Sequence, residues 1–585
     1  MDPQQFSRRL SAQTSRSTTG SNASSIRLRS PTGIKLREKV LPKTADPYTF
    51  HLPRFLPECD LNTILTIETV KEVMEMVYTN RKLEKELFDP EQQIWGAHRD
   101  LKRLKILATL VLIEEPTYII NFVDNDIWDD KLPLDPVSHP MLFDGWLDGH
   151  IESFCHRQYW VLAPVLDFTT TKHRVFDARF PMPFEEVLDW SQAKGGANGL
   201  VLKVKIHEKY QRWAPLSKPY SFYAIKRFDK SQRDHFLNEK EALLRFSLPE
   251  DRHKNLIRLL FSYDIGSHMF MIFPGANWDL EGFWKDNRNN PASSEELIWL
   301  IHQCQGLADG LCKVHDYGGR HGDIKSRNLL FFADPQNPPG RLVVADFTLM
   351  RFHSPDSDVT KASKVDKTTT YRPPEADGLY STVASPKFDI WTLGCVYLEF
   401  VTWHLLGGDA ITEGSFQAED GETYESFSTA RQSDDDGLAH REDKFFNQFA
   451  TNAAKVKASV ETWIHCLRGH PNTSPALRGL LDLVKDHMLV VVPDDRCGMH
   501  MVKETLNIIF NQCGKHAEYA KPDSKRSTKG AVIAPRWTEK SKTYSRVAVG
   551  AMSTSPEPRD SGSKLDLETI NQAFSDAIPF PQNQP

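Results

Sequence analysis

Two stretches in the middle of the chain carry residue types that could bind the phosphates of a nucleotide. The first, Lys194 to Val201 (KGGANGLV), lies between two β-like runs. The backbone N–H groups of such a glycine-rich turn can close over phosphates, because glycine has no Cβ to clash. The second, Ser221 to Phe228 (SFYAIKRF), contains Lys226, and Glu239 follows 13 residues later in an amphipathic stretch. Since a paired carboxylate can aim an ammonium at phosphate oxygens, these residues predict a phosphate site.

Four further motifs follow in order in the second half of the chain. They are HGDIKSRNLL (His321 to Leu330), VVADFTLM (Val343 to Met350), TTTYRPPE (Thr368 to Glu375) and FDIWTLGC (Phe388 to Cys395). With the lysine motif, this order and spacing resembles the eukaryotic protein kinases, whose signature comprises a glycine-rich loop, V-A-I-K, H-R-D, D-F-G and A-P-E. The resemblance covers about residues 184 to 512. It implies an α+β, bilobal fold with a small β-rich lobe and a large helical lobe.

The resemblance implies that ATP binds between the two lobes. Lys226 matches the strand lysine that contacts the α- and β-phosphates, and Glu239 matches its partner on the following helix, with Glu241 as the alternative. The residues that match positions covering the phosphates or enclosing the adenine are Gly195, Gly196, Gly199, Val201, Ala224, Phe273, Ala276 and Leu330.

The same resemblance implies Mg²⁺-dependent phosphoryl transfer to protein substrates. Asp323 matches the aspartate that orients the substrate hydroxyl and accepts its proton, and Lys325 matches the lysine that neutralises charge on the γ-phosphoryl group. Asn328 and Asp346 match the two Mg²⁺ ligands, and both offer hard oxygen donors. Lys325 and Thr368 are typical of the Ser/Thr type, so we expect serine or threonine as the acceptor.

Other matches imply structural roles. Glu375 and Arg496 match a buried ion pair that ties the activation segment to the large lobe, and Asp389 matches a carboxylate that holds the catalytic-loop backbone. Removing one partner of such a pair would cost roughly 3 to 5 kcal/mol. We interpret His321 as a packed histidine rather than as a base or metal ligand.

Three positions depart from the family pattern. Lys194 replaces the first glycine of the phosphate loop, Gly322 replaces the arginine of H-R-D, and Thr348 replaces the glycine of D-F-G. The missing arginine usually pairs with a phosphorylated activation loop. We therefore hypothesise that activity does not depend on that phosphorylation in the usual way. Because Thr348 is β-branched and stiff, we expect it to hinder reorientation of Asp346 without removing the metal ligand.

These departures leave two other functions open. The first is a pseudokinase or nucleotide-binding signalling scaffold, which an assay of phosphotransfer by the purified protein would distinguish from a kinase. The second is a small-molecule phosphotransferase of the aminoglycoside or choline kind, which also uses an H-G-D loop followed by asparagine. That family would lack the TTTYRPPE segment and the DIWTLGC helix, so the sequence favours a protein kinase.

The elements that position these residues lie in the centre of a chain with several parts. Helical periodicity predicts a module before the kinase-like region, a combination that resembles kinase-like proteins of filamentous fungi. An intramolecular contact between this module and the kinase-like region is left open. Residues 407–443 hold eleven acidic residues against two basic ones, and we expect a solvated acidic insertion there. The expected parts are a disordered basic arm (1–45), a helical N-terminal module (46–180), a kinase domain (184–512) with a small lobe (184–276) and a large lobe (277–512), and a disordered tail (513–585).

Composition limits the other function classes. The 585 residues include 72 Lys and Arg against 78 Asp and Glu, so no strongly basic balance indicates a specific nucleic-acid partner. The eight cysteines form no C-x-x-C pair, which favours a reducing compartment over a disulfide framework or a zinc site. The strongest apolar run, Ile106 to Ile113, is far shorter than the roughly 20 residues of a membrane span. We expect a soluble protein of the cytoplasm, the nucleus or both.

Overall fold

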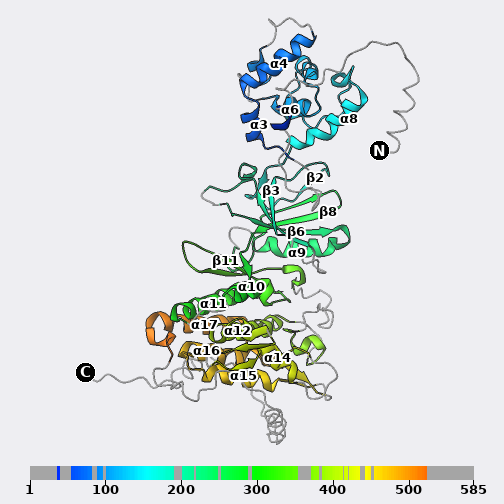
Figure 1. Cartoon of the computed structure of the whole chain (residues 1–585). Coiled ribbons are helices and arrows are strands. Elements are labelled where there is room, and N and C mark those ends of the chain that lie inside the picture. The colour runs from blue at the N-terminus through cyan, green and yellow to red at the C-terminus, as the bar shows by residue number, and fades with distance from the viewer. Residues whose placement is uncertain are drawn as a thin grey trace, which may run out of the picture.

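The computed structural model describes the helical module and both predicted lobes. The described residues are 36–39, 55–81, 89–96, 101–189, 200–215, 219–247, 252–287, 293–352, 370–380, 385–412, 414–418, 421–434, 442–449 and 453–522. The predicted arm, apart from 36–39, and the predicted tail from 523 onward lie outside these residues. In Figure 1 the helical module, the sheet-rich lobe and the helical lobe follow one another along the long axis of the molecule.

The N-terminal module is helical and encloses its own apolar core. The side chains of the stripe Val70, Val73, Met74 and Val77 are all buried on α4. Asp129 accepts hydrogen bonds from the backbone N–H groups of Lys105 and Ile106 at 2.9 and 3.0 Å, which satisfies two of the donors that the start of α6 leaves open. The helices of the module are α3 (Glu58–Ile64), α4 (Ile67–Arg81), α5 (Pro90–Gln93), α6 (Leu104–Leu112), α7 (Ile119–Asp124) and α8 (Asp148–Arg157).

A six-stranded sheet in the order β2-β7-β8-β6-β4-β3 forms the small lobe. Neighbouring strands are antiparallel, except for the parallel pair β2 and β7. Helix α9 (Arg233–Arg245) lies beside the sheet (Figure 1). Phe236 on α9 packs against Phe228 on β6, with their ring centroids 5.4 Å apart. The strands are β2 (Arg174–Phe176), β3 (Phe184–Asp189), β4 (Leu200–Ile206), β6 (Tyr223–Asp229), β7 (Phe261–Ile265) and β8 (His268–Pro274).

The small lobe begins earlier in the chain than the expected start at residue 184. Strand β1 (Leu166–Asp167) pairs with β5 (Gln211–Arg212), and β2 extends the edge of the main sheet beside β7. Leu166 and Phe168 are buried in the same apolar core as Ile225 and Tyr263. The sequence did not separate these short strands from the helical module, because strands of two and three residues show no measurable alternation.

Alternation along β6 decides which of its residues face the cleft between the lobes. Tyr223 and Ile225 are buried in the core on the outer side of the sheet, whereas Lys226 bonds to a side chain of α9 on the other side. Successive side chains of a strand point to opposite faces, so Ala224 shares the face of Lys226. The register with β8 places Ala224 opposite Phe273.

Helices make up most of the large lobe, and α12 (Lys387–Leu406) lies at its centre. Residues Phe388 to Leu405 of this helix are all buried, as expected for a helix that is apolar on every side. The helices around it are α10 (Leu280–Asp286), α11 (Ser294–Asp316), α15 (Ala458–Gly469), α16 (Pro475–Leu483) and α17 (Met499–Lys515). The short strands that follow β8 are β9 (Trp278–Asp279), β10 (Gly319–Arg320), β11 (Leu329–Ala333), β12 (Gly340–Val344) and β13 (Arg351–Phe352).

The first residues of the predicted tail continue the large lobe. Helix α17 extends to Lys515, and a further turn, Ala517–Ala520, follows it. The side chains of Cys513 and Ala520 are buried in the main core. The expected boundary at residue 513 therefore falls inside an ordered helix, because the apolar spacing of α17 persists for one more turn.

The expectation of a solvated loop at 407–443 is wrong for the described residues of this segment. They form α13 (Asp409–Thr412), a hairpin of β14 (Ser415–Gln417) and β15 (Thr423–Glu425), and α14 (Phe427–Ser433). Phe416, Tyr424 and Phe427 are buried in the main core. The acidic residues dominate the composition, but the few apolar residues between them anchor the segment to the lobe.

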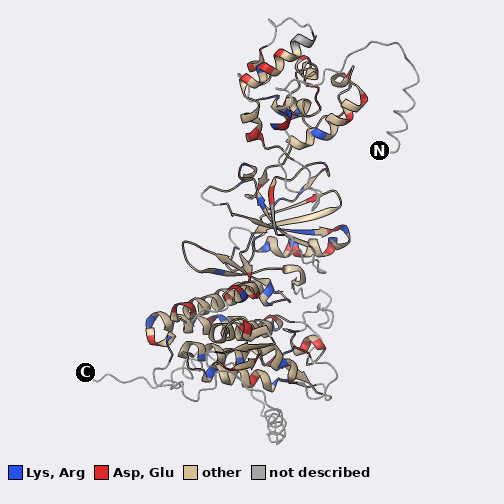
Figure 2. Cartoon of the chain, viewed as in Figure 1, with Lys and Arg blue, Asp and Glu red and all other residues tan. Residues whose placement is uncertain are grey.

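Charged residues of both signs are interspersed along the described helices and strands (Figure 2). This mixture agrees with the small net charge of −6. None of the described helices combines the length and the apolar character that a bilayer crossing needs.

Candidate active site

A cleft of about 430 Å³ lies between the small and the large lobe, within the size range of small-molecule sites. The connection from β8 to β9 forms one wall, and both lobes contribute side chains to it. The predicted site residues that line the cleft are Val201, Ala224, Lys226, Glu239, Phe273, Ala276, Lys325, Asn328, Leu330 and Asp346. The structure therefore brings residues from positions 201 to 346 together at one place.

Lys226 on β6 and Glu239 on α9 form a buried ion pair at the back of this cleft. The Lys226 Nζ atom donates to both carboxylate oxygens of Glu239, at 2.9 and 2.8 Å. The two residues are 6% and 1% exposed. Glu239, rather than the alternative Glu241, is the partner, because Glu241 instead forms an exposed pair with Arg245.

Two residues from the large lobe complete this cluster. Lys226 Nζ also donates to Asp346 Oδ1 at 2.9 Å and to Thr348 Oγ1 at 2.9 Å. Asp346 has a left-handed backbone conformation with φ of 64°, at the start of the short helical turn Phe347–Leu349. This turn lets Asp346 and Thr348 point to the same ammonium. Thr348 needs no positive φ there, so a β-branched residue fits the position.

The cluster contains one ammonium and two carboxylates, and the pKa values follow from this imbalance. Burial raises the pKa of Glu239, and the Asp346 charge raises it further. Burial would also raise the pKa of Asp346, but the Lys226 ammonium and the Thr348 hydroxyl outweigh it and hold that pKa below its usual range. Asp346 therefore stays ionised, and it shares the Lys226 ammonium with Glu239.

Asp323 lies in the loop between β10 and β11, held by two neighbours. Lys325 Nζ donates to Asp323 Oδ2 at 2.7 Å. The Asn328 amide nitrogen donates to the same oxygen at 2.9 Å and to the Asp323 carbonyl at 2.8 Å. These bonds use the amide nitrogen of Asn328, so they leave its harder donor atom, the amide oxygen, for other ligands. Together they fix the orientation of the Asp323 carboxylate.

Asp389 on α12 fixes the backbone of this loop by hydrogen bonds. Its two carboxylate oxygens accept hydrogen bonds from the N–H groups of His321 and Gly322, each at 2.8 Å. Gly322 has φ of 83°, a conformation that favours glycine. His321 is fully buried, its Nε2 lies 3.1 Å from the Ala345 carbonyl oxygen, and burial lowers the pKa of its imidazole. His321 is thus a packed, hydrogen-bonded residue of the core.

The remaining predicted site residues lie outside the described part of the chain. They are Gly195, Gly196, Gly199 and Thr368, together with the departure at Lys194. The phosphorylation hypothesis concerns the segment between Asp346 and Glu375, and residues 353–369 of that segment are also outside the described part.

The sequence did not predict one buried hydrogen-bond network beside the loop that carries Asp323. The Tyr371 hydroxyl lies 3.2 Å from Ser326 Oγ and donates to Glu399 Oε2 at 2.6 Å. Arg431 of the acidic insertion lies 3.5 Å from Glu399 Oε1 and donates to Asp443 at 2.8 Å. Arg431 is one of only two basic residues in 407–443, a signal that could have marked it. The insertion is thereby connected to the loop that carries Asp323.

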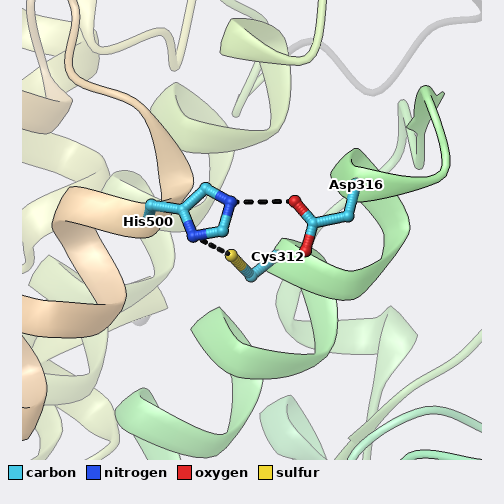
Figure 3. A group of neighbouring side chains, drawn as sticks. All are labelled: Cys312, Asp316 and His500. Carbon is cyan, nitrogen blue, oxygen red and sulfur yellow. Dashed lines mark hydrogen bonds and ion pairs between the residues drawn. The ribbon is translucent and has the colours of Figure 1, made fainter.

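A second cluster of potential ligands lies on α11 and α17. Figure 3 shows the His500 ring between Cys312 and Asp316, with its Nδ1 3.2 Å from Cys312 Sγ and its Nε2 2.8 Å from Asp316 Oδ1. One metal ion binds only one nitrogen of an imidazole, and here the two nitrogens face different partners. Burial raises the pKa of the Cys312 thiol to about 11. We interpret the cluster as a hydrogen-bonded link between two helices.

Comparison with known proteins adds an independent observation. A family model described as protein kinase domain matches residues 211–506, about half of the chain. These residues include every described residue of the Lys226 cluster and of the Asp323 loop.

Individual relatives are similar over shorter regions. The CTD kinase subunit alpha of Schizosaccharomyces pombe is 31% identical over 151 residues, which are 26% of this chain and 24% of that protein. A probable CTD kinase subunit alpha homolog of Encephalitozoon cuniculi is 28% identical over 191 residues, 32% of this chain and 51% of that protein. A homeodomain-interacting protein kinase 1 of Caenorhabditis elegans is 28% identical over 173 residues, 29% of this chain and 19% of that protein. The chain spans about half the length or less of these curated relatives.

Proposed function

Because the chain belongs to the eukaryotic Ser/Thr protein kinase family, we propose that it transfers the γ-phosphoryl group of ATP to serine or threonine hydroxyls of protein substrates. The observation that carries this proposal is the meeting of Lys226, Glu239 and Asp346 at one end of the cleft. These residues come from both lobes, and phosphoryl transfer depends mainly on positioning and electrostatics.

The side chains of the cleft suit a divalent metal and a nucleotide. Asp346 and Asn328 would hold Mg²⁺, since both line the cleft and offer hard oxygen atoms. When bound, the metal supplies charge stabilisation at the phosphates. Val201, Ala224 and Leu330 line the cleft as apolar surfaces for the adenine ring.

Three side chains of the cleft and the neighbouring loop would then have different roles in phosphoryl transfer. Lys226, fixed by Glu239, would orient the α- and β-phosphates. Asp323, whose carboxylate is oriented by Lys325 and Asn328, would accept the proton of the substrate hydroxyl. Lys325 would offset the charge that develops on the transferred group.

Two further expectations remain proposals. We propose that the helical module docks on the small lobe, supported by a 3.0 Å hydrogen bond from the Glu58 N–H to the Tyr210 hydroxyl and by an edge-on contact of Phe55 with the Tyr210 ring. We also propose that the protein acts in a reducing compartment, cytoplasm or nucleus, supported by eight cysteines that are all free thiols.

The test is transfer of labelled γ-phosphate from ATP to a mixture of protein substrates, with wild type, Lys226→Met and Asp346→Asn. We expect Mg²⁺-dependent labelling of serine and threonine by the wild type and a loss of about 10²- to 10³-fold in each variant, the cost of removing one electrostatic contact from such a site. Equal background labelling by all three proteins would overturn the proposal and favour a nucleotide-binding scaffold.

A further inference from the structure

Thr348 occupies an unusual place in the Lys226 cluster. It is 1% exposed, and its hydroxyl oxygen contacts three charged groups. Lys226 Nζ lies at 2.9 Å, Glu239 Oε2 at 2.7 Å and Asp346 Oδ1 at 2.5 Å. The position belongs to the glycine of the family's D-F-G motif, which offers no side chain at all.

The chemistry of a hydroxyl defines what these contacts can be. A hydroxyl has one proton to donate and two lone pairs to accept with. Lys226 has only donors, so it donates to Thr348 Oγ1, and the hydroxyl proton is available to the carboxylates of Glu239 and Asp346. The hydroxyl therefore adds a donor exactly where two carboxylates compete for one ammonium.

This extra donor acts on the orientation of Asp346. The single hydroxyl proton of Thr348 can go to Glu239 or to Asp346, and the shorter distance, 2.5 Å against 2.7 Å, favours Asp346 Oδ1. Lys226 donates to the same oxygen, so rotation of the Asp346 carboxylate away from the cluster would break two charge-assisted bonds. Such bonds are about twice as strong as neutral ones. Thr348 and Asp346 lie in one short turn, so the restraint is local and does not depend on the motion of either lobe.

We propose that Thr348 is a positioning residue whose hydroxyl holds the Asp346 carboxylate in the orientation that binds the metal of a metal–nucleotide complex. The inference rests on the proposed function, because it assigns the metal to Asp346. Thr348 itself contacts neither metal nor nucleotide in this account. The hydroxyl of Thr348 thereby adds a restraint on Asp346 that a glycine at this position could not supply.

The test measures binding of ADP to the full chain by titration calorimetry, with Mg²⁺ and with a chelator in its place. Thr348→Val removes the hydroxyl and keeps the shape, and Thr348→Ser restores the hydroxyl. Thr109→Val is the matched control, because Thr109 is also fully buried but its hydroxyl donates only to the Lys105 carbonyl in the helical module.

We expect Thr348→Val to weaken ADP binding about tenfold with Mg²⁺ and less than twofold without it. Thr348→Ser should return to within about threefold of wild type, and Thr109→Val should match wild type under both conditions. If Thr348→Val does not fold, Thr348→Gly makes the same comparison without a buried branched side chain.

Three results with the Thr348 variants would overturn the proposal: unchanged ADP binding by Thr348→Val, equal losses of affinity with and without Mg²⁺, or failure of Thr348→Ser to restore binding. The readout is binding, so it is separate from phosphotransfer. A wild type that binds ADP with Mg²⁺ but transfers no phosphate would contradict the proposed function and leave the Thr348 comparison decisive. A wild type that binds no ADP with Mg²⁺ would contradict both.

Discussion

Two of the buried ion pairs among the described residues are similarly buried but differ in how fully their groups are paired. In the large lobe, Arg496 donates to both oxygens of Glu375 at 2.8 and 3.1 Å. Its other donors reach the carbonyls of Val490 and Lys387. One guanidinium therefore meets one carboxylate, and each of its three nitrogen atoms makes at least one hydrogen bond. This pair is charge-balanced and closed.

The Lys226–Glu239 pair in the cleft is less completely enclosed than the Arg496–Glu375 pair. Lys226 meets the carboxylates of Glu239 and Asp346, and the side chain of Asp346 is 23% exposed to the cleft. The difference separates two roles: removing one partner of the sealed pair would leave a buried unpaired charge, whereas the cluster at the cavity edge is the place where we propose that a ligand binds.

The largest effect should come from breaking the closed pair. We expect Glu375→Ala to leave Arg496 buried without a counter-ion and to lower the free energy of unfolding by about 3 to 5 kcal/mol. Denaturant unfolding, followed by the protection of α12 amides against hydrogen exchange, measures this loss. A loss below about 1 kcal/mol would contradict the structural role of the pair.

Asp346→Asn should show the opposite pattern. Phosphotransfer should fall by about 10²- to 10³-fold, equivalent to about 3 to 4 kcal/mol of transition-state stabilisation. The free energy of unfolding should change by no more than about 1 kcal/mol, because the variant keeps the Lys226–Glu239 pair. The same unfolding measurement checks this. Destabilisation as large as that of Glu375→Ala would erase the distinction between the two pairs.

Glu399 is a further buried carboxylate, and its effect on stability should depend on pH. Burial raises the pKa of Glu399 to about 7, and the nearby Arg431 only partly offsets this. A carboxyl with a raised folded-state pKa stabilises the fold at pH below about 4.5 and loses that contribution as pH rises through 7.

From pH 5 to 8 the wild type should therefore lose up to about 3 kcal/mol of large-lobe stability that Glu399→Gln does not lose. Hydrogen exchange of α12 across this pH range measures the difference. Asp129, whose pKa burial also raises to about 7, lies in the helical module and serves as the control: Asp129→Asn should leave the pH dependence of α12 unchanged. Parallel pH profiles for wild type and Glu399→Gln would contradict the assignment.

The smallest effect is expected at the helix link of α11 and α17. His500 is 73% exposed at its side chain and Asp316 is 54% exposed, so solvent screens their interaction. His500→Ala should lower the free energy of unfolding by less than about 1 kcal/mol, with unchanged phosphotransfer. Stabilisation of the wild type by added Zn²⁺ that is lost in His500→Ala would show instead that the cluster binds metal.

The resemblance to protein kinases predicted the bilobal fold and the convergence of Lys226, Glu239 and Asp346, because each of these residues lies in a motif that matches one of that family. The Arg496–Glu375 pair and the Asp389 bonds to the catalytic-loop backbone were predicted on the same basis. The boundaries of the small lobe and of the large lobe were less predictable from the sequence. Strands β1 and β2 are too short to show a period.

The contacts of Thr348 and Arg431 were not predicted from the sequence. In the sequence, Thr348 is recognisable only as a replacement for the glycine of the D-F-G motif. The geometry of the Phe347–Leu349 turn is needed to show that its hydroxyl reaches Lys226, Glu239 and Asp346. Arg431 looked like a minor charge in an acidic segment. Its pairing with Glu399, 32 residues away along the chain, depends on how α14 folds back on α12.

The most direct test of the Lys226 cluster is a crystal structure of the full chain grown with Mn²⁺ and ADP, with an anomalous difference map to locate the metal. We predict a manganese peak about 2 Å from side-chain oxygens of Asp346 and Asn328, with the ADP phosphates next to Lys226. A nucleotide bound outside the cleft, or a metal peak away from both residues, would contradict the account.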